Sequence, residues 1–369
     1  MKILIVQDYL RSGGTERQSV LLANAFAAAG HATTLLTFRP AGPLDATVSP
    51  AVTRRTLLPF DLRLDWFAPR LISTLAAAAP DVVLCMGRMA NCYAGGIQKN
   101  FPHTAVIATM RTGKPLPWLF RRSLRRSRHI IANSHDAHDN LVAHHAIAPE
   151  KITVIHNSLV FPSEVAAGDA ALSPRQTLRA PHSASPATTV LLCVAMFRPE
   201  KNQRELIEIA ATLPSTLDWQ LWLTGDGPAR HECEHLAARK HLGARVKFLG
   251  FVSDPSPLYT AADIAVHASS SESLSNFLIE AQAHGLPAVA CAAQGIRESF
   301  VPGRTGWSIP PGDRAAFRAA LERLIAAPPA ERAARSAEAR AYARAHFDPA
   351  HQVAAYLELF HTLTNAHAT

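Results

Sequence analysis

The sequence predicts an α/β fold built from two doubly wound domains with parallel sheets. Short continuous runs of Val, Ile and Leu alternate with helical patterns along the whole 369-residue chain. Such runs, which lack polar alternation, are typical of parallel strands that helices cover on both faces. The series occurs twice, and a chain of this length holds about two ordinary domains. We therefore expect two domains that face each other across a cleft, with the ligand site at the carboxyl ends of their strands.

Each half of the chain supplies six strand candidates, and helical patterns such as Gln18–Ala29 lie between them. In the first half the candidates are Lys2–Gln7, Thr33–Phe38, Asp81–Met86, Thr104–Met110, His129–Ala132 and Lys151–His156. In the second half they are Thr188–Ala195, Trp219–Thr224, Arg245–Leu249, Ile264–Ala268, Pro287–Cys291 and Gly306–Ile309.

The expected domain boundaries follow the composition. We expect a first domain over 1–160, a linker rich in Ala, Ser and Pro over 161–187, a second domain over 188–345 and a C-terminal helix over 346–369. An amphipathic pattern over Pro349–Leu363 supports that helix, which can cross back to the first domain.

The totals limit the class of protein. Hydrophobic residues make up 48% and charged residues 18%, which is ordinary globular composition. The net charge of +8 favours anionic partners such as nucleotides or an anionic membrane face. Five scattered cysteines in mostly apolar runs indicate buried thiols in a reducing compartment. With neither a signal-peptide pattern nor an apolar run of about 20 residues, we expect a cytoplasmic protein that can lie peripherally on the inner face of the plasma membrane.

Two carboxylates, Glu272 and Glu280, stand with seven residues between them. Positions eight apart do not share one face of a helix, so we expect Glu272 in a loop and Glu280 in the helix that follows. Ser275 is a suitable helix cap, with Asn276 as the first helical residue. A helix N-terminus attracts phosphate, and carboxylates accept hydrogen bonds from sugar hydroxyls, so the pattern predicts a nucleotide-sugar site.

Glycines and cations follow several predicted strands. Gly13 and Gly14 lie after the first strand, and Gly225 and Gly250 end two later ones. Such glycines let the backbone approach an anion. Arg198 and Lys201 follow the first strand of the second half, and two cations there suit a diphosphate leaving group. Phe251, beside Gly250, offers an aromatic edge to a base.

Together these motifs resemble the retaining glycosyltransferases of the group 1, or family 4, type, which have two Rossmann-like domains in the GT-B arrangement. The resemblance is strong over 188–320, in the ordered segments RPEKN, LTGDGP, VKFLGFV, ADIAVHASSSESLSNFLIEAQAHGLPAVA, QGIRE and GRTGW. It is looser over 1–157, in SGGTE, IIANS and VIHNS.

The resemblance implies a role for each matching residue. Glu280 would hold the ribose hydroxyls and Glu272 the donor sugar, while Arg198 and Lys201 would hold the diphosphate. The other implied substrate-binding residues are Gly13, Gly14, Gly225, Gly250, Phe251, Leu274, Ser275 and Asn276.

The chain departs from the family pattern at two places. Ala195-Met196 stands where members often carry Gly-Arg, and Arg198 can substitute for that arginine. Arg111 stands where many members carry a histidine near the end of the fourth N-terminal strand. Arginine cannot act as a general base at neutral pH, so Arg111 is expected to stabilise phosphate or bind an anionic acceptor.

Two other patterns have weaker interpretations. His231 to His235 reads H-E-x-x-H, a zinc-hydrolase motif, but its predicted helix is polar on most sides. Most of the other histidines are expected to be solvated or to make local hydrogen bonds. The basic segment 117–128 carries aromatics, which fits an anionic membrane surface, an acidic acceptor or a plain solvated helix. No nucleic-acid motif is present, and the chain has no Asp-x-Asp, which agrees with a mechanism that needs neither a metal nor another cofactor.

The sequence thus predicts a retaining, metal-independent hexosyltransferase. The donor would be a UDP- or GDP-linked sugar, and the acceptor a cell-surface glycan or lipid-linked glycan such as lipopolysaccharide core or exopolysaccharide. Alternatives are a nucleotide-sugar epimerase or phosphorylase-like enzyme of the same fold, a non-catalytic sugar-nucleotide binder and a zinc hydrolase.

Overall fold

The computed structural model describes residues 1–11, 13–162 and 174–365. The chain divides into two compact units. Unit 1 contains Met1–Ser158 together with the chain from Pro349, and unit 2 contains Leu159–Asp348. None of the described helices is long and apolar enough to cross a bilayer.

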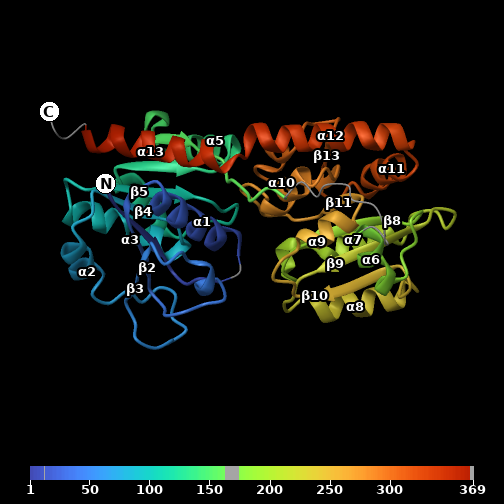
Figure 1. Ribbon diagram of the computed structural model, residues 1–369, viewed down its shortest axis with the longest axis horizontal. Helices are drawn as coiled ribbons and strands as arrows, with labels where there is room; N and C mark the ends of the chain where they lie inside the picture. The colour runs from blue at the N-terminus through green and yellow to red at the C-terminus, as the bar shows by residue number, and fades with distance from the viewer. Residues whose placement is uncertain (12, 163–173, 366–369) are drawn as a thin grey trace. The chain divides into compact units, whose positions relative to one another are not determined.

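Unit 1 contains a seven-stranded parallel sheet with the order β3-β2-β1-β4-β5-β6-β7 (Figure 1). Six strands lie where the apolar runs predict them. The seventh, β3, has no apolar residue and all four of its residues are exposed, so it carries no hydrophobic signal. The strands are β1 Lys2–Gln7, β2 Ala32–Thr37, β3 Thr53–Thr56, β4 Val82–Cys85, β5 Ala105–Met110, β6 His129–Ala132 and β7 Ile152–Val154.

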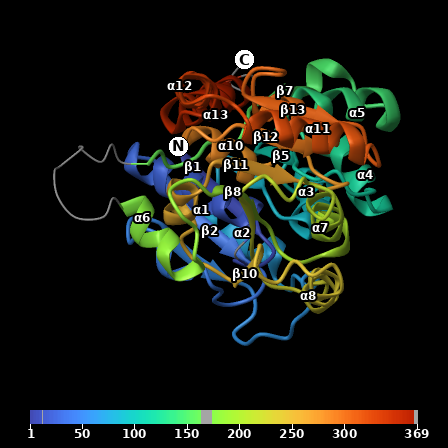
Figure 2. The same cartoon turned by 90° about the vertical axis from the view of Figure 1, so that its right-hand side faces the viewer.

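Helices cover both faces of this sheet (Figure 2). On one face, α1 (Gly14–Ala28) and α13 (Pro349–Asn365) pack against the strands and each other. The rings of Tyr356 and Phe360 both lie edge-on to Phe26, with centroids 6.0 and 5.5 Å away. The opposite face is covered by α2 Leu71–Ala78, α3 Arg88–Asn100, α4 Trp118–Arg126 and α5 His135–His145. The last helix of the chain is therefore part of the first unit.

Unit 2 contains a six-stranded parallel sheet with the order β10-β9-β8-β11-β12-β13. All six strands fall within a residue or two of the predicted positions. They are β8 Thr189–Val194, β9 Trp219–Thr224, β10 Val246–Gly250, β11 Ile264–His267, β12 Ala288–Cys291 and β13 Gly306–Ile309.

The helices of unit 2 also form two layers. One face carries α7 Gln203–Ala210, α8 Arg230–Arg239 and α11 Arg314–Ile325. The other carries α6 Pro174–Arg179, α9 Ser256–Ala261 and α10 Asn276–Ala283, and α12 Pro329–His346 packs against α10. Short 3-10 turns occur at η1 Asp45–Thr47, η2 Pro149–Lys151, η3 Ala180–His182, η4 Pro199–Lys201 and η5 Ile296–Ser299.

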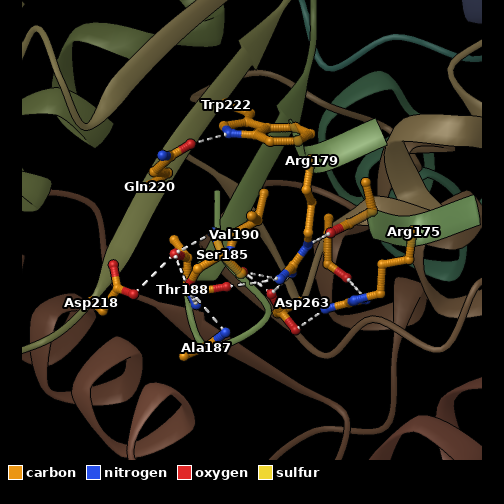
Figure 3. A network of polar contacts seen from close by, with 12 residues as sticks. Arg175, Arg179, Ser185, Ala187, Thr188, Val190, Asp218, Gln220, Trp222 and Asp263 are labelled. Carbon is orange, nitrogen blue, oxygen red and sulfur yellow. Dashed lines mark hydrogen bonds and ion pairs between the residues drawn. The ribbon is translucent and has the colours of Figure 1, made fainter. Parts of the chain in front are cut away.

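The predicted linker, 161–187, lies partly outside the described residues, which omit 163–173. The part from 174 onward forms α6 and η3 and is held on unit 2 by arginines (Figure 3). The buried Arg179 donates to the Asp263 carboxylate at 2.5 Å and to the Ala261 carbonyl at 2.8 Å. Asp263 also accepts the backbone N–H of Val190, so this network joins α6 to the starts of β8 and β11.

Each sheet reverses its strand order beside its first strand. In unit 1 the reversal lies between β1 and β4, and in unit 2 between β8 and β11. Ligands of doubly wound sheets bind outside the carboxyl ends of the strands at such a point. The segments after β8 and β11 carry Arg198, Lys201 and Glu272.

Candidate functional site

Glu272 lies at the centre of a polar cluster at the carboxyl ends of β8 and β11. Its Oε1 atom is 2.5 Å from Nζ of Lys201 and 2.7 Å from Nε2 of His267. Lys201 comes from η4, after β8, and His267 is the last residue of β11. The Glu272 side chain is only 11% exposed, so a carboxylate and an ammonium meet at a largely buried position.

These contacts keep Glu272 ionised. Burial alone would raise its pKa, but contacts with His267 and Lys201 outweigh the burial and lower the pKa of Glu272 to about 2. The group is therefore a fixed hydrogen-bond acceptor at neutral pH, which suits a sugar hydroxyl.

Backbone contacts hold the loop that carries Glu272. The Glu200 carbonyl accepts hydrogen bonds from the Ser269 hydroxyl at 3.1 Å and the Ser270 N–H at 2.9 Å, which ties this loop to η4. From the other side, Gly295 lies directly against the Ser273 carbonyl, and a Cβ atom at Gly295 would lie 1.7 Å from that oxygen. The φ of +71° at Gly295 also favours glycine. The loop therefore lies between two turns at the ends of neighbouring strands.

Arg198 stands beside this cluster without a partner. Its side chain makes no ion pair or side-chain hydrogen bond with any described residue, and it is partly exposed. The turn that carries it is fixed by glycines after β9: a Cβ at Gly225 would lie 2.1 Å from the Ala195 carbonyl oxygen, and one at Gly227 would lie 2.4 Å from that of Phe197. Close packing against Ala195 therefore explains why residue 225 is a glycine, independently of the substrate-binding role expected for it.

Glu280 lies in the helix after the Glu272 loop, as predicted. α10 begins at Asn276, and the Ser275 hydroxyl caps it by accepting the Leu278 N–H at 3.4 Å. Glu280, in the second turn of α10, accepts a hydrogen bond from the Tyr259 hydroxyl at 2.6 Å. Leu274 and Ser275 are buried, and Asn276 is partly exposed.

The remaining residues predicted for this unit lie at the end of β10. Gly250 has a φ of +72° with open space around its Cβ position apart from an Arg230 nitrogen at 3.5 Å. Phe251 follows it with 58% of its surface exposed. An exposed aromatic ring at the carboxyl end of a strand is available to a ligand.

In unit 1, Gly13 and Gly14 begin α1, as the N-cap and the first helical residue. Arg111 lies just after β5, and its guanidinium is held inside the unit. It donates to the Tyr356 hydroxyl of α13 at 2.6 Å and to the Asn157 side chain, while its Nε is buried without a partner among the described residues. The C-terminal helix therefore fixes Arg111. The sequence predicted that this helix can return to the first domain, but not its contact with Arg111.

A buried carboxylate, Asp8, follows β1 at the reversal point of unit 1. It accepts the backbone N–H groups of Met89 at 3.0 Å and Ala90 at 2.6 Å, at the start of α3. Burial raises the pKa of the Asp8 carboxyl to about 6, even though both hydrogen bonds favour the ionised form. Asp8 caps a helix at the expected ligand edge, but the sequence shows only an isolated aspartate after a strand.

Sequence reasoning also missed His267 and Tyr259. Most histidines were expected to be solvated or to make local hydrogen bonds, and no site role was predicted for His267, whose side chain is 2% exposed and contacts Glu272. The sequence feature that could have indicated His267 is its place at the end of an apolar strand, two residues before the serines that lead to Glu272. Tyr259 gave no comparable signal, because it precedes Glu280 by 21 residues and meets it only in the folded unit.

The H-E-x-x-H motif lies on an exposed face of α8. The two Nε2 atoms of His231 and His235 are 3.1 Å apart, and Glu232 pairs with Arg204 at 2.7 Å. Within the described ranges, no group of three metal-ligating side chains includes either histidine. The motif therefore lacks the enclosed third ligand that a zinc hydrolase needs.

Two family models match the chain, one in each half. The model for glycosyl transferases group 1 matches residues 174–343, and the model for glycosyltransferase family 4 matches residues 12–159. Together they span both sheets except β1, and they include the whole cluster around Glu272.

Similar proteins agree with these models. LpsE of Rhizobium meliloti (strain 1021), a lipopolysaccharide core biosynthesis glycosyltransferase, is 34% identical over 137 residues, 37% of this chain and 39% of LpsE. The match thus spans about two fifths of that relative's length.

Among solved structures, HepE of Anabaena, in complex with UDP, has a TM-score of 0.79 at 21% identity and covers 98% of this chain and 100% of HepE. WaaG, a glycosyltransferase involved in lipopolysaccharide biosynthesis, has a TM-score of 0.72 at 18% identity and covers 96% and 98%. These structures share the fold of two Rossmann-like domains, GT-B. The chain belongs to the glycosyltransferases of group 1 and family 4.

Proposed function

We propose that the protein transfers a hexose from a nucleotide-diphosphate sugar to a glycan or lipid-linked acceptor, with retention of configuration and without a metal. The observation that supports this most directly is the buried cluster of Glu272, Lys201 and His267 at the reversal point of unit 2, with Glu280 two turns further on. Three structures of HepE are complexes with UDP, with UDP and glucose, and with UDP-glucose, which favours a UDP-linked donor here.

In this proposal Glu280 accepts hydrogen bonds from the ribose and Glu272 from the sugar. Arg198 offers an unpaired guanidinium to the diphosphate, and the Lys201 ammonium lies beside Glu272. As the sugar C1–O bond to the diphosphate breaks, these two cations stabilise the negative charge that develops on the leaving group. The acceptor hydroxyl forms the new C1–O bond from the same face, and its proton leaves with the nucleoside diphosphate.

The acceptor would be a cell-surface glycan of the lipopolysaccharide-core or exopolysaccharide kind. The similarity to LpsE, a glycosyltransferase of lipopolysaccharide core biosynthesis, supports the first of these. A peripheral membrane contact would suit a lipid-linked acceptor. The start of α4 exposes 60% of Trp118 and 53% of Leu119, while Phe120 and Leu124 are buried. Exposed arginines share that helix, which is the composition of an interfacial segment.

The test is a donor screen followed by product analysis. Purified protein, treated with a chelator, is titrated with UDP- and GDP-linked hexoses by calorimetry and then incubated with the best donor and candidate acceptors. We expect one donor class to bind and the product to keep the anomeric configuration of the donor, read by NMR. An inverted product, a free isomerised sugar nucleotide or activity only with added metal would contradict the proposal.

A further inference from the structure

A pocket of unit 2 lies at the amino ends of its strands. Its volume is about 410 Å³, and its lining includes Thr189, Ile264 and Pro287, which stand at or next to the first residues of β8, β11 and β12. Because these strands are parallel, the pocket lies at the opposite edge of the sheet from Glu272, which follows the end of β11. It is therefore separate from the proposed donor site.

The charge of this pocket is strongly positive. The charged residues of the lining are four arginines (Arg175, Arg332, Arg335 and Arg340) and a single carboxylate, Asp263. That carboxylate is already shared by Arg175 and Arg179 (Figure 3). His284, also in the lining, adds no charge at neutral pH, because burial lowers its pKa to about 4.

Several of these arginine groups have no anionic partner in the part of the chain that the structure describes. The Arg332 side chain has no ion pair or hydrogen bond there, and the Arg340 guanidinium contacts the Ser336 hydroxyl at 2.9 Å and the His284 carbonyl at 3.5 Å. Arg335 pairs with Glu331 and lies over the Trp307 ring, and its buried Nε and Nη1 atoms have no hydrogen-bond acceptor among the described residues. Buried donors without acceptors cost stability, so an oxyanion in the pocket would satisfy groups that are now unpaired.

The arrangement of α12 brings these donors together. Arg332, Ser336 and Arg340 are four residues apart and so share one face of the helix. A Cβ atom at Gly285 would lie 2.2 Å from both the Arg340 Nη1 and the Ser336 Oγ, so glycine lets this face approach the turn before β12. The other walls are apolar and aromatic, with Leu286, Leu324 and Tyr259.

We propose that this pocket is a binding site for a small phosphate ester, separate from the donor site. The phosphate would accept hydrogen bonds from Arg332, Arg335, Arg340 and the Ser336 hydroxyl, since planar guanidinium groups match phosphate oxygens. The organic part would lie against the apolar wall. A pocket of this size accommodates a small molecule and encloses most of its surface.

The experiment uses full-length protein and two probes, inorganic phosphate and phenyl phosphate. Binding of each is measured by calorimetry, for the wild type, the double variant Arg332→Ala/Arg340→Ala and the control Arg344→Ala, which removes a basic residue of α12 outside the pocket lining. We expect the double variant to weaken phosphate binding by about tenfold or more. The control should bind like the wild type. Circular dichroism and UDP titration of each variant verify that the unit is folded.

The site proposal is wrong if the wild type binds neither probe at about 10 mM, or if the double variant binds as tightly as the wild type. If the double variant does not fold, the conservative variant Arg340→Gln replaces it. We expect Arg340→Gln also to weaken phosphate binding. Equal affinity for the two probes would overturn the proposal that the ligand is a phosphate ester, and the pocket would then be a site for inorganic phosphate.

The donor site must be excluded as the source of binding. Arg198→Ala should retain phosphate binding, because Arg198 lies at the other edge of the sheet. Loss of phosphate binding in that variant would place the anion at the donor site and overturn the second site. The result does not depend on the proposed transferase activity, since neither probe is a sugar donor.

Discussion

At the residue scale, the two glutamates have different surroundings, so their substitutions should affect different steps. Glu280 accepts a hydrogen bond from the Tyr259 hydroxyl, whereas Glu272 is held by a cation and a histidine. Glu280→Ala should weaken donor affinity by about tenfold or more, because it removes the half-buried carboxylate that is proposed to accept hydrogen bonds from the ribose. Glu272→Ala should lower kcat more than it raises KM.

Calorimetric titration with the donor and steady-state kinetics check this pair. Glu322→Ala is the matched control, since Glu322 forms a surface pair with Arg318 on α11. Normal turnover and normal donor affinity in both variants would show that the assigned site is wrong.

The depressed pKa of Glu272 predicts an acid-sensitive contribution to stability. Its folded pKa is about 2, against 4.5 for the free side chain, so the unfolded chain binds the proton first as the pH falls. The stabilisation is complete above pH 4.5 and is lost between about pH 4.5 and pH 2, to a total of roughly 3 kcal/mol. Denaturant unfolding of wild type and Glu272→Gln over this range should give curves that converge towards pH 2. A constant difference in the free energy of unfolding between the two proteins would contradict a lowered pKa for Glu272.

The sequence could name the carboxylates and cations of the site but not their partners. Glu272, Glu280, Arg198 and Lys201 stand in short motifs with a readable spacing. His267 and Tyr259 become neighbours of the glutamates only through strand order and helix packing. The spacing of residues along the chain does not contain that information.

At the element scale, hydrophobic runs predicted twelve of the thirteen strands that lie in the described part of the chain. Buried parallel strands are apolar throughout, so their signal is strong. The exception, β3, reads Thr-Arg-Arg-Thr at the edge of its sheet, where it needs no apolar face. The loop geometry around Glu272 could not be predicted either, because it depends on contacts between turns that lie far apart in the sequence.

The turn at Gly295 offers a test of one such contact. Gly295→Ala adds a methyl group that would meet the Ser273 carbonyl, whereas Gly303→Ala adds one to open space at a nearly equal φ, +73° against +71°. Both variants carry the cost of a positive φ, about 1–2 kcal/mol. Only Gly295→Ala should lose further stability and displace the Glu272 loop.

Thermal unfolding and donor turnover measure the two effects. We expect Gly303→Ala to keep full turnover at its lower stability, and Gly295→Ala to lose turnover as well. Equal stability and equal activity in the two variants would show that the contact with Ser273 does not position the loop.

At the scale of the whole molecule, α13 completes a unit that begins at the other end of the sequence. Tyr356 lies fully buried against Phe26, and its hydroxyl accepts from Arg111. Tyr356→Ala should destabilise unit 1 by about 3–5 kcal/mol, because it removes a large buried side chain. Tyr356→Phe should cost less, about 1.5–3 kcal/mol, the value of a hydrogen bond to a charged group.

Hydrogen exchange locates these effects. In Tyr356→Ala we expect faster exchange in β1 and β2 as well as in α13, since all three share one core. Ala substitution at the exposed Glu358 of the same helix is the control and should leave β1 protected. Faster exchange confined to 349–365 would mean that α13 packs on unit 1 without stabilising its sheet.

The return of α13 also has a consequence for the order in which the protein is made. A ribosome releases the residues of unit 2, which end at Asp348, before it releases the helix that closes the core of unit 1. The second unit can therefore fold during synthesis while the first still exposes the apolar face around Phe26. During that interval the nascent chain carries a surface that a chaperone, or another unfinished chain, could bind before α13 covers it.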